Sequence, residues 1–224
     1  MSLVELERRF GVPAVGVIEP GVRSVATATG AGRVGVIGTV GTIASGAYQA
    51  AAARLAPELE LTCAACPGFV EFVERGDIAS DQVHVLAERL LAPLREAKVD
   101  ALLLGCTHYP FLARTISDVM GRDVVLVSSA DETAFEVRAR LEAEGLRAGG
   151  APVTTPAPPL GDAALLPPPD DELVVAAKQL QPERDGRGDR RHRWLSSGDV
   201  GVFRERGRRL LGPELDHAEA VPWA

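Results

Sequence analysis

Short apolar runs that do not alternate with polar residues constrain the fold of this 224-residue chain most strongly. Five runs have this character, and they occupy residues 14–18, 34–37, 59–63, 101–104 and 124–127. Such runs are typical of strands in a parallel sheet, because helices cover both faces of that sheet. Segments with a helical pattern separate the runs, at residues 43–55, 81–97, 111–120 and 131–143. This alternation predicts an α/β fold built on a mainly parallel sheet.

The composition narrows the class of protein and its compartment. The net charge of −7 argues against non-specific binding to nucleic acid. The sequence shows no charged-then-apolar leader, and no apolar run approaches the roughly 20 residues that a membrane span requires. We therefore expect a cytoplasmic protein that binds neither nucleic acid nor membrane. The three cysteines are an odd number in a reducing compartment, which argues against a disulfide framework.

The last third of the chain has a different character. Seven of the 16 prolines fall within residues 151–171, so we interpret residues 150–190 as a Pro-rich insert or linker. Residues 183–209 carry nine arginines and five acidic residues, which we interpret as a solvated face and not as a nucleic-acid patch. The final segment, residues 191–224, is predicted to hold a short strand at 192–195 and a helix at 202–211.

Polar residues follow the predicted strands, at the end where parallel α/β sheets bind ligands. After the run at 34–37 comes GTVGT, in which the hydroxyls of Thr39 and Thr42 open a helix and the glycines permit close approach. This arrangement suits a small anion such as a carboxylate. Ordinary N-capping by a threonine explains the same residues, and the two interpretations are compatible.

The run at 101–104 leads into the tetrapeptide Gly-Cys-Thr-His. Cys106 lies between a strand and a helix start, where backbone N–H groups and the helix dipole lower the pKa of a thiol. His108 can stabilise the thiolate or exchange a proton with it. The alternative is a small buried cysteine that packs under a turn.

Two further patterns match known motifs only in part. Three thiols and an imidazole form a conceivable zinc set, namely Cys63, Cys66, Cys106 and His108. The Cys-x-His spacing is shorter than the usual knuckle, so we expect no metal. Residues 30–35 match the letters of G-x-G-x-x-G, but they precede a strand instead of following one. We therefore do not interpret them as a dinucleotide-binding loop.

Four motifs occur in the order found in bacterial glutamate racemase, and the chain resembles that member of the aspartate/glutamate racemase family. They are VPAVGVIEPG, VGVIGTVGTIASGAY, CPGFVEFVERG and GCTHYP. The tail HRWLSSGDVGVF…RRLLG is similar to the C-terminus of that family. The resemblance implies a three-layer, parallel-sheet lobe. It also implies an isomerase that converts L-glutamate to D-glutamate for peptidoglycan synthesis, and thus for cell-wall biogenesis and cell shape.

The resemblance also implies which residues act. Family members use no cofactor, and two α/β lobes each supply one cysteine, so that one thiolate removes the α-proton and the other thiol returns a proton. Cys106 matches the second of these cysteines, and His108 matches the residue that assists proton transfer. Glu74 matches a supporting carboxylate. Thr107, together with His108, matches a substrate contact, and so do Thr39 and Thr42.

The scarcity of lysine agrees with a cofactor-independent reaction. A pyridoxal-dependent racemase requires a lysine that forms a Schiff base at the site. The two lysines of the chain, Lys98 and Lys178, fall at a predicted helix end and in the variable tail.

The sequence departs from the family at its beginning, where it lacks the Asp-Ser-Gly and Ala-Cys-Asn-Thr motifs of the first lobe. We therefore expect in-frame coding sequence upstream of Met1. We assign residues 1–128 to a complete second lobe, 129–149 to a helix that returns towards a largely missing first lobe, and 191–224 to a strand-helix segment of that first lobe. A homodimer is compatible with this interpretation. Two alternatives stay open: a related cofactor-independent racemase of another small acid, and a non-catalytic lobe that binds a ligand.

Overall fold

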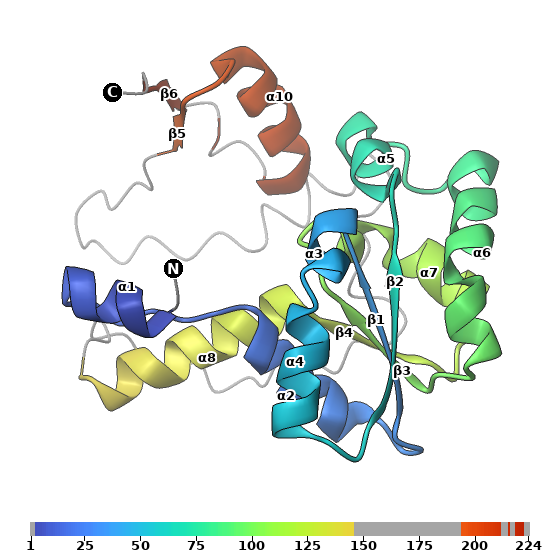
Figure 1. The fold of residues 1–224 in the computed structure, drawn as a ribbon. Coiled ribbons are helices and arrows are strands. Elements are labelled where there is room, and N and C mark those ends of the chain that lie inside the picture. Colours follow the sequence, from blue (N-terminus) through green and yellow to red (C-terminus); the bar gives the residue numbers. More distant parts are fainter. Residues whose placement is uncertain (1–2, 146–193, 212–214, 216–217, 222–224) are drawn as a thin grey trace. The chain divides into compact units, whose positions relative to one another are not determined.

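The computed structural model describes residues 3–145, 194–211, 215 and 218–221 (Figure 1). The chain divides into two compact units, between Leu166 and Pro167, and each unit is described by itself. The predicted insert at 150–190 lies outside the described residues.

Four strands form the sheet of the N-terminal unit: β1 (Arg33–Gly38), β2 (Glu60–Ala65), β3 (Ala101–Leu104) and β4 (Val125–Ser128). Their order is β2-β1-β3-β4, and every neighbouring pair is parallel. Four of the five predicted runs correspond to these strands, which confirms the α/β class. Because the strands are parallel, they all end at one edge of the sheet, here named the carboxyl edge, and begin at the opposite amino edge.

Helices cover both faces of this sheet (Figure 1). One face carries α2 (Ile18–Ala28), α4 (Ala47–Leu55) and α8 (Ser129–Ala143), and the other carries α5 (Phe69–Arg75), α6 (Asp81–Glu96) and α7 (Ala113–Met120). Three further elements are α1 (Leu3–Phe10), α3 (Val40–Ala44) and the 3-10 helix η1 (Tyr109–Leu112). This arrangement gives the predicted three layers.

The side chains of β3 alternate between two apolar cores. Leu102 and Leu104 belong to the larger core with α5, α6 and α7, whereas Leu103 packs in the smaller core with α2 and α4. All four β3 residues are fully buried. Complete burial of one leucine side chain contributes about 1.5–3 kcal/mol, so packing from both faces fixes the strand firmly. The loop that follows Leu104 therefore starts from a rigid point.

The predicted strand at 14–18 is wrong. Ile18 begins α2 instead, and the preceding residues have no regular structure. The backbone of Ala14 is satisfied by side chains in place of a strand ladder: its N–H donates to the Glu7 carboxylate at 2.9 Å and its carbonyl accepts from Arg140 at 3.4 Å. Pro20 lies in the first turn of α2, where the missing N–H costs no helical hydrogen bond. Residues 19–21, Glu-Pro-Gly, thus lie in the first turn of a helix.

The predicted helix at 43–55 is two helices, α3 and α4. Gly46 separates them with a positive φ of 67°, a left-handed conformation that suits glycine. The helix predicted at 81–97 is present as α6, and Ser80 is its N-cap, with its hydroxyl accepting from the Val83 N–H. Ser128 caps α8 in the same way, with its hydroxyl accepting from the Asp131 N–H.

The glycine-rich segment before β1 lies at the amino edge and is occupied by a side chain of the protein itself. The N–H groups of Gly30 and Ala31 donate to the Asp100 carboxylate at 2.8 and 2.6 Å, and the Thr29 hydroxyl donates to it at 2.6 Å. This contact joins the start of β1 to the start of β3. It agrees with the interpretation of residues 30–35 as something other than a dinucleotide loop.

The C-terminal unit contains β5 (Leu195–Ser196), α10 (Val200–Leu211) and β6 (Glu219–Ala220), and the two strands pair in parallel. The Arg204 guanidinium donates to the Ala218 carbonyl at 3.2 Å. The strand predicted at 192–195 is described only from Trp194 onward, and the predicted helix at 202–211 begins at Val200. In the described parts of the chain, no helix has both the length and the apolar composition to cross a membrane.

Candidate functional site

The strand order makes one position on the carboxyl edge different from the others, namely the position between β1 and β3. From β1 the chain moves outward to β2, and then it returns across the sheet to β3 on the other side of β1. The loops after β1 and β3 therefore leave in opposite directions. In open α/β sheets, ligands bind at such a switch point. Thr39 follows β1 directly, and Cys106 follows β3 after Gly105, so topology brings the two predicted elements to this point.

The loop that carries Cys106 is held by the backbone and by an aromatic anchor. The Gly105 N–H donates to the Ile37 carbonyl at 2.8 Å, which extends the pairing of β3 with β1 by one residue. Tyr109 is fully buried; its hydroxyl donates to the Cys66 carbonyl at 3.1 Å, and its ring meets Phe69 edge to face, with centroids 5.4 Å apart. Cys106 itself is only partly buried. The loop therefore presents an accessible thiol on a fixed backbone.

Three predicted catalytic side chains form a line across this loop. The Cys106 Sγ lies 3.9 Å from Nδ1 of His108, and Nε2 of His108 lies 3.6 Å from a Glu74 carboxylate oxygen. Glu74 comes from α5, whereas the other two residues come from the loop after β3. When Nε2 carries the proton and faces the carboxylate, Nδ1 is the nitrogen that accepts a proton from the thiol. The line can thus move a proton between Cys106 and His108, with Glu74 stabilising the imidazolium.

The environment of Cys106 corrects one expectation. Burial raises the pKa of the Cys106 thiol, and the N–H groups of His108 and Tyr109 lower it only in part. The predicted lowering of the thiol pKa is therefore wrong for this unit: the backbone donors are present, but desolvation outweighs them. Formation of the thiolate then depends on a neighbouring base, and His108 is in place to act as one.

The two threonines after β1 lie together. The hydroxyl oxygens of Thr39 and Thr42 are 2.9 Å apart, and the Thr39 hydroxyl also accepts from the Thr42 N–H at 3.3 Å, as an N-cap of α3. Both side chains are partly exposed. Thr107 is exposed, with its hydroxyl 3.5 Å from Nδ1 of His108. Hydroxyl groups therefore flank the switch point on both loops: those of Thr39 and Thr42 after β1, and that of Thr107 after β3.

The other two cysteines do not join this site. Cys63 packs in the smaller core and Cys66 in the larger one, so the two thiols lie on opposite faces of the sheet. Burial raises the pKa of the Cys66 thiol to about 12 and also raises that of Cys63. The zinc set considered from the sequence is not assembled, and the described residues contain no group of three or more side chains placed to hold a metal ion.

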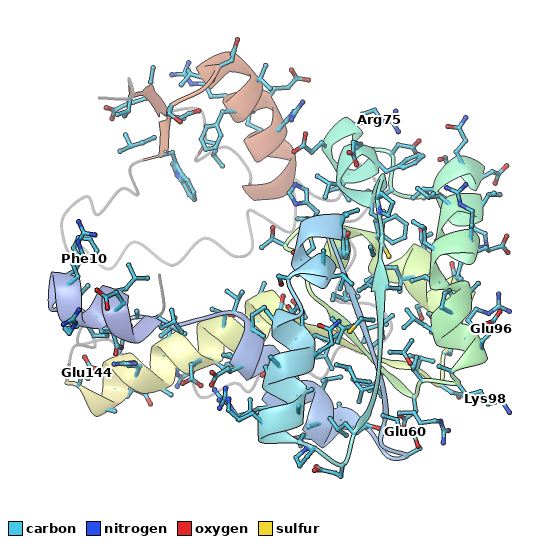
Figure 2. The ribbon with its side chains drawn as sticks, viewed as in Figure 1. Phe10, Glu60, Arg75, Glu96, Lys98 and Glu144 are labelled. Carbon is cyan, nitrogen blue, oxygen red and sulfur yellow. The ribbon has the colours of Figure 1, made fainter. Side chains whose placement is uncertain are left out.

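The position of Lys98 bears on the cofactor question. Lys98 is the second residue after α6, and its carbonyl accepts from the Arg33 side chain at the start of β1. Figure 2 shows Lys98 near Glu60, where β2 begins, and at the opposite end of the unit from Arg75 of α5. This lysine therefore lies at the amino edge, away from Cys106. Lys178 lies outside the described residues.

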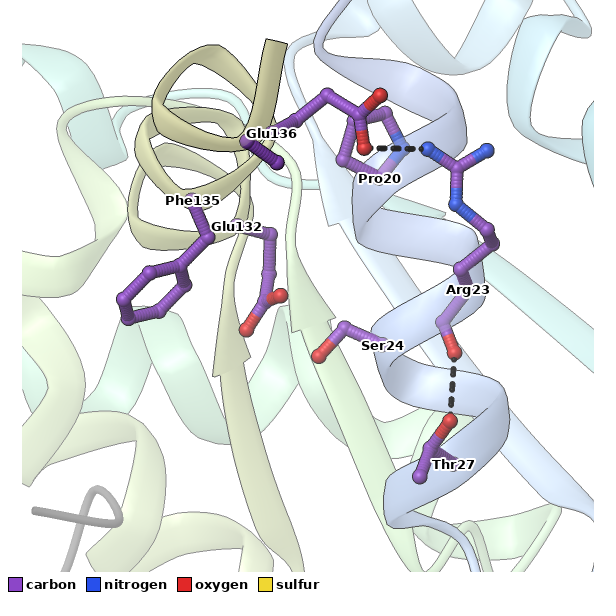
Figure 3. Close-up of a pocket in the computed structure, with 8 residues that line it drawn as sticks. Pro20, Arg23, Ser24, Thr27, Glu132, Phe135 and Glu136 are labelled. Carbon is purple, nitrogen blue, oxygen red and sulfur yellow. Dashed lines mark hydrogen bonds and ion pairs between the residues drawn. The ribbon is translucent and has the colours of Figure 1, made fainter. Parts of the chain in front are cut away.

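A pocket of about 430 Å³ lies elsewhere, between α2 and α8 (Figure 3). Its lining comes from these outer helices and includes none of the residues that follow the strands. Arg23 reaches across it to Glu136 at 2.9 Å and also pairs with Glu19 at 3.6 Å. Because Arg23 and Glu136 of its lining are paired with each other, we regard the pocket as part of the contact between α2 and α8.

The Asp/Glu/hydantoin racemase family matches residues 2–137, which contain the whole sheet and the site just described. The chain belongs to this family. A glutamate racemase of Acidothermus cellulolyticus is 45% identical over 219 residues, which are 98% of this chain and 70% of that protein. Members of the family therefore extend well beyond the length of this chain.

Solved structures of the family have the same fold. A glutamate racemase from Bacillus anthracis is similar with a TM-score of 0.74 and 30% identity, covering 100% of this chain and 69% of that one. A glutamate racemase from Francisella tularensis in complex with D-glutamate is similar with a TM-score of 0.70 and 25% identity, covering 97% and 67%. The chain thus spans about two thirds of each racemase.

Sequence reasoning missed two polar residues behind the site, Tyr48 and Ser129. Both are buried, and the Ser129 hydroxyl donates to the Leu104 carbonyl at 2.8 Å. Tyr48 lies in a helix whose neighbours are mostly alanine, so its pattern indicated only a core residue. Its place beside β3 depends on the strand order, which the sequence pattern does not reveal.

Proposed function

We propose that this chain is part of a glutamate racemase, in which Cys106 is one of the two thiols that exchange the α-proton of glutamate. The reaction converts L-glutamate to D-glutamate for peptidoglycan, without a cofactor. The observation that carries the proposal is the line from Cys106 through His108 to Glu74 at the switch point of the sheet. Family membership and the motifs around these residues support it.

The proposed step begins with a proton transfer inside the protein. The Cys106 thiol passes its proton to Nδ1 of His108, and the carboxylate of Glu74 stabilises the imidazolium that forms. The thiolate then removes the α-proton of glutamate and becomes a thiol again, leaving the electron pair on the α-carbon. Return of a proton to the same face restores the original enantiomer, whereas a proton from a second thiol on the other face completes the inversion.

Substrate binding is proposed for the hydroxyls around the switch point. Thr39 and Thr42 lie at the end of β1, and Thr107 lies on the loop after β3. Hydroxyl and backbone N–H donors suit carboxylate oxygens. We propose that these side chains, together with His108, hold the carboxylates of glutamate so that its α-carbon faces Cys106. We further propose that residues 1–128 act as the lobe that carries this half of the site.

The test separates proton exchange from inversion. The 224-residue chain is incubated with each glutamate enantiomer in D₂O, and α-deuteration by NMR and optical rotation are followed together. We expect deuteration of one enantiomer without loss of its optical activity, because one thiol serves only one face. General acid–base groups contribute about 10²–10⁴-fold, so Cys106→Ser is expected to lower the exchange rate by at least about 10².

Cys63→Ser is the matched control, since it removes a thiol that is similarly half-buried and not in a disulfide, but on β2. It is expected to leave the exchange rate unchanged. Absence of exchange with both enantiomers would contradict the proposal. Rapid racemisation that depends on Cys106 would show instead that the chain holds a second base.

A further inference from the structure

The hydroxyl of Tyr48 lies directly behind the loop that carries Cys106. Tyr48 comes from α4 and is 1% exposed. A Cβ atom added to Gly105 would lie 2.9 Å from the Tyr48 hydroxyl and 2.8 Å from the Ile37 carbonyl oxygen. Residue 105 must therefore be glycine, because the backbone rests against these two groups. The phenol touches the one residue that separates β3 from Cys106.

Ser129 supports the residue before Gly105 from a neighbouring element. It is the first residue of α8, and it is buried like Tyr48. The Ser129 hydroxyl donates its proton to the Leu104 carbonyl at 2.8 Å. Two buried polar side chains therefore support the end of β3, Ser129 at Leu104 and Tyr48 at Gly105.

The phenol of Tyr48 is uncharged at neutral pH. Burial raises the pKa of its phenol; the contact with Ser129 opposes that shift, and negative charge on Cys106 or Cys63 adds to it. The phenol therefore keeps its proton at neutral pH.

We propose that Tyr48 is a positioning residue for Cys106: its hydroxyl supports Gly105, next to the Leu104 carbonyl that Ser129 holds, and so fixes the thiol relative to the backbone donors of His108 and Tyr109. This inference rests on the proposed role of Cys106, but its consequence is read on the thiol itself. When the support is lost, the loop relaxes, the two N–H groups stabilise the thiolate less well, and the thiol becomes harder to ionise.

The experiment measures the pH profile of Cys106 alkylation in the 224-residue chain. The protein is treated with iodoacetamide from pH 6 to 10, and the tryptic peptide 99–114 is quantified by mass spectrometry. That peptide contains Cys106 and excludes Cys63 and Cys66. Rates are normalised to the high-pH plateau, so that the midpoint reports ionisation and the plateau reports access.

Tyr48→Phe is expected to move the midpoint upward and to slow normalised alkylation at pH 7 by about threefold to tenfold, which corresponds to about 0.5–1 pH unit. Ser129→Ala keeps the phenol packed and is expected to produce a similar shift. The double variant is expected to shift little further, because the two side chains support adjacent residues of one short segment, Leu104 and Gly105. Additive shifts, or a midpoint that Tyr48→Phe leaves unchanged, would overturn the proposal.

Thr115→Val is the matched control. The Thr115 hydroxyl is also buried and donates to a backbone carbonyl, that of Ile78, at 2.9 Å, away from the Cys106 loop. It is expected to lower Tm without moving the Cys106 midpoint. An equal shift in this control would show general loosening and contradict a specific role. If the midpoint shifts as expected while glutamate exchange is absent, Tyr48 positions the thiol and the proposed function fails by itself.

Discussion

The two edges of the sheet hold their polar side chains in different ways. At the amino edge, the Asp100 carboxylate accepts from Thr29 and Ala31 at 2.6 Å each and from Gly30 at 2.8 Å. At the carboxyl edge, the contacts of His108 with Cys106, Glu74 and Thr107 are 3.9, 3.6 and 3.5 Å. The first set has the lengths of charge-assisted hydrogen bonds, whereas the second is long for any hydrogen bond.

This difference separates structure from chemistry. Short hydrogen bonds to Asp100 join the start of β1 to the start of β3. The polar groups that form them are already paired with one another. Catalytic hydrogen bonds are often long before a substrate binds and tighten in the complex. Changes at the amino edge should therefore affect stability and spare proton exchange, while changes at the carboxyl edge should do the reverse.

The largest effect is expected from His108→Gln. Glutamine keeps a polar group at this position but cannot take the proton of Cys106, so exchange of the glutamate α-proton should fall by about 10². Stability should change little, because no short contact is lost. NMR-detected deuteration and thermal melting of the same preparation measure the two quantities.

Glu74→Gln provides the comparison for this variant. Because Glu74 acts through His108, Glu74→Gln should lower the rate of α-proton exchange less than His108→Gln does. Equal and complete loss of α-proton exchange in both variants, together with a lower Tm, would mean that the carboxyl edge is structural. The contrast between the two edges would then be false.

Much of the sheet was predictable, because buried parallel strands are recognisable in the sequence as short, uninterrupted apolar runs. The error at 14–18 has a specific cause: the backbone of Ala14 is satisfied by Glu7 and by Arg140, which is 126 residues away in the sequence. No local pattern reveals such a partner. The tight packing of β3 between two cores, by contrast, follows directly from an uninterrupted apolar run.

The candidate site was predictable where its residues adjoin in the sequence. Cys106, Thr107 and His108 form one motif, and that motif follows a strand, β3, that is recognisable in the sequence. Tyr48 and Ser129 escaped prediction because only the order β2-β1-β3-β4 brings α4 and the start of α8 to the end of β3. The direction of the Cys106 pKa was missed for a related reason: helix-end donors can be read from the sequence, but desolvation is a property of the packed fold.

A smaller effect, on stability alone, is expected from Asp100→Ala. The change removes acceptors for three short hydrogen bonds at the amino edge and leaves two N–H groups to water. Because the site is largely open to solvent, we expect a loss of about 1–2 kcal/mol in the free energy of unfolding. Urea denaturation measures this loss, and the rate of glutamate α-deuteration is the control that should not change.

A contrary result would be as informative. If Asp100→Ala lowered exchange as strongly as His108→Gln while remaining folded, the amino edge would be coupled to the chemistry through β3. The two edges would then have to be treated as one unit.

The smallest effect is the pH dependence that Asp100 adds to stability. Burial by itself would raise the pKa of this carboxyl, but the hydrogen bonds from Thr29, Ala31 and Gly30 outweigh it and hold the pKa below its usual range. An aspartate in the unfolded chain titrates near about 3.9. Because the folded value is the lower one, the stabilisation is present above about pH 4 and is lost as pH falls through the folded pKa.

Urea midpoints of the native chain and Asp100→Asn, compared from pH 7 to pH 3, isolate this contribution. The asparagine keeps one acceptor oxygen but cannot titrate, so the difference in stability between the two proteins should be constant above about pH 5 and should shrink towards pH 3. A difference that grows on acidification would require a raised pKa for Asp100. It would mean that the carboxylate at the amino edge is strained and not satisfied, which would remove the basis for distinguishing the two edges.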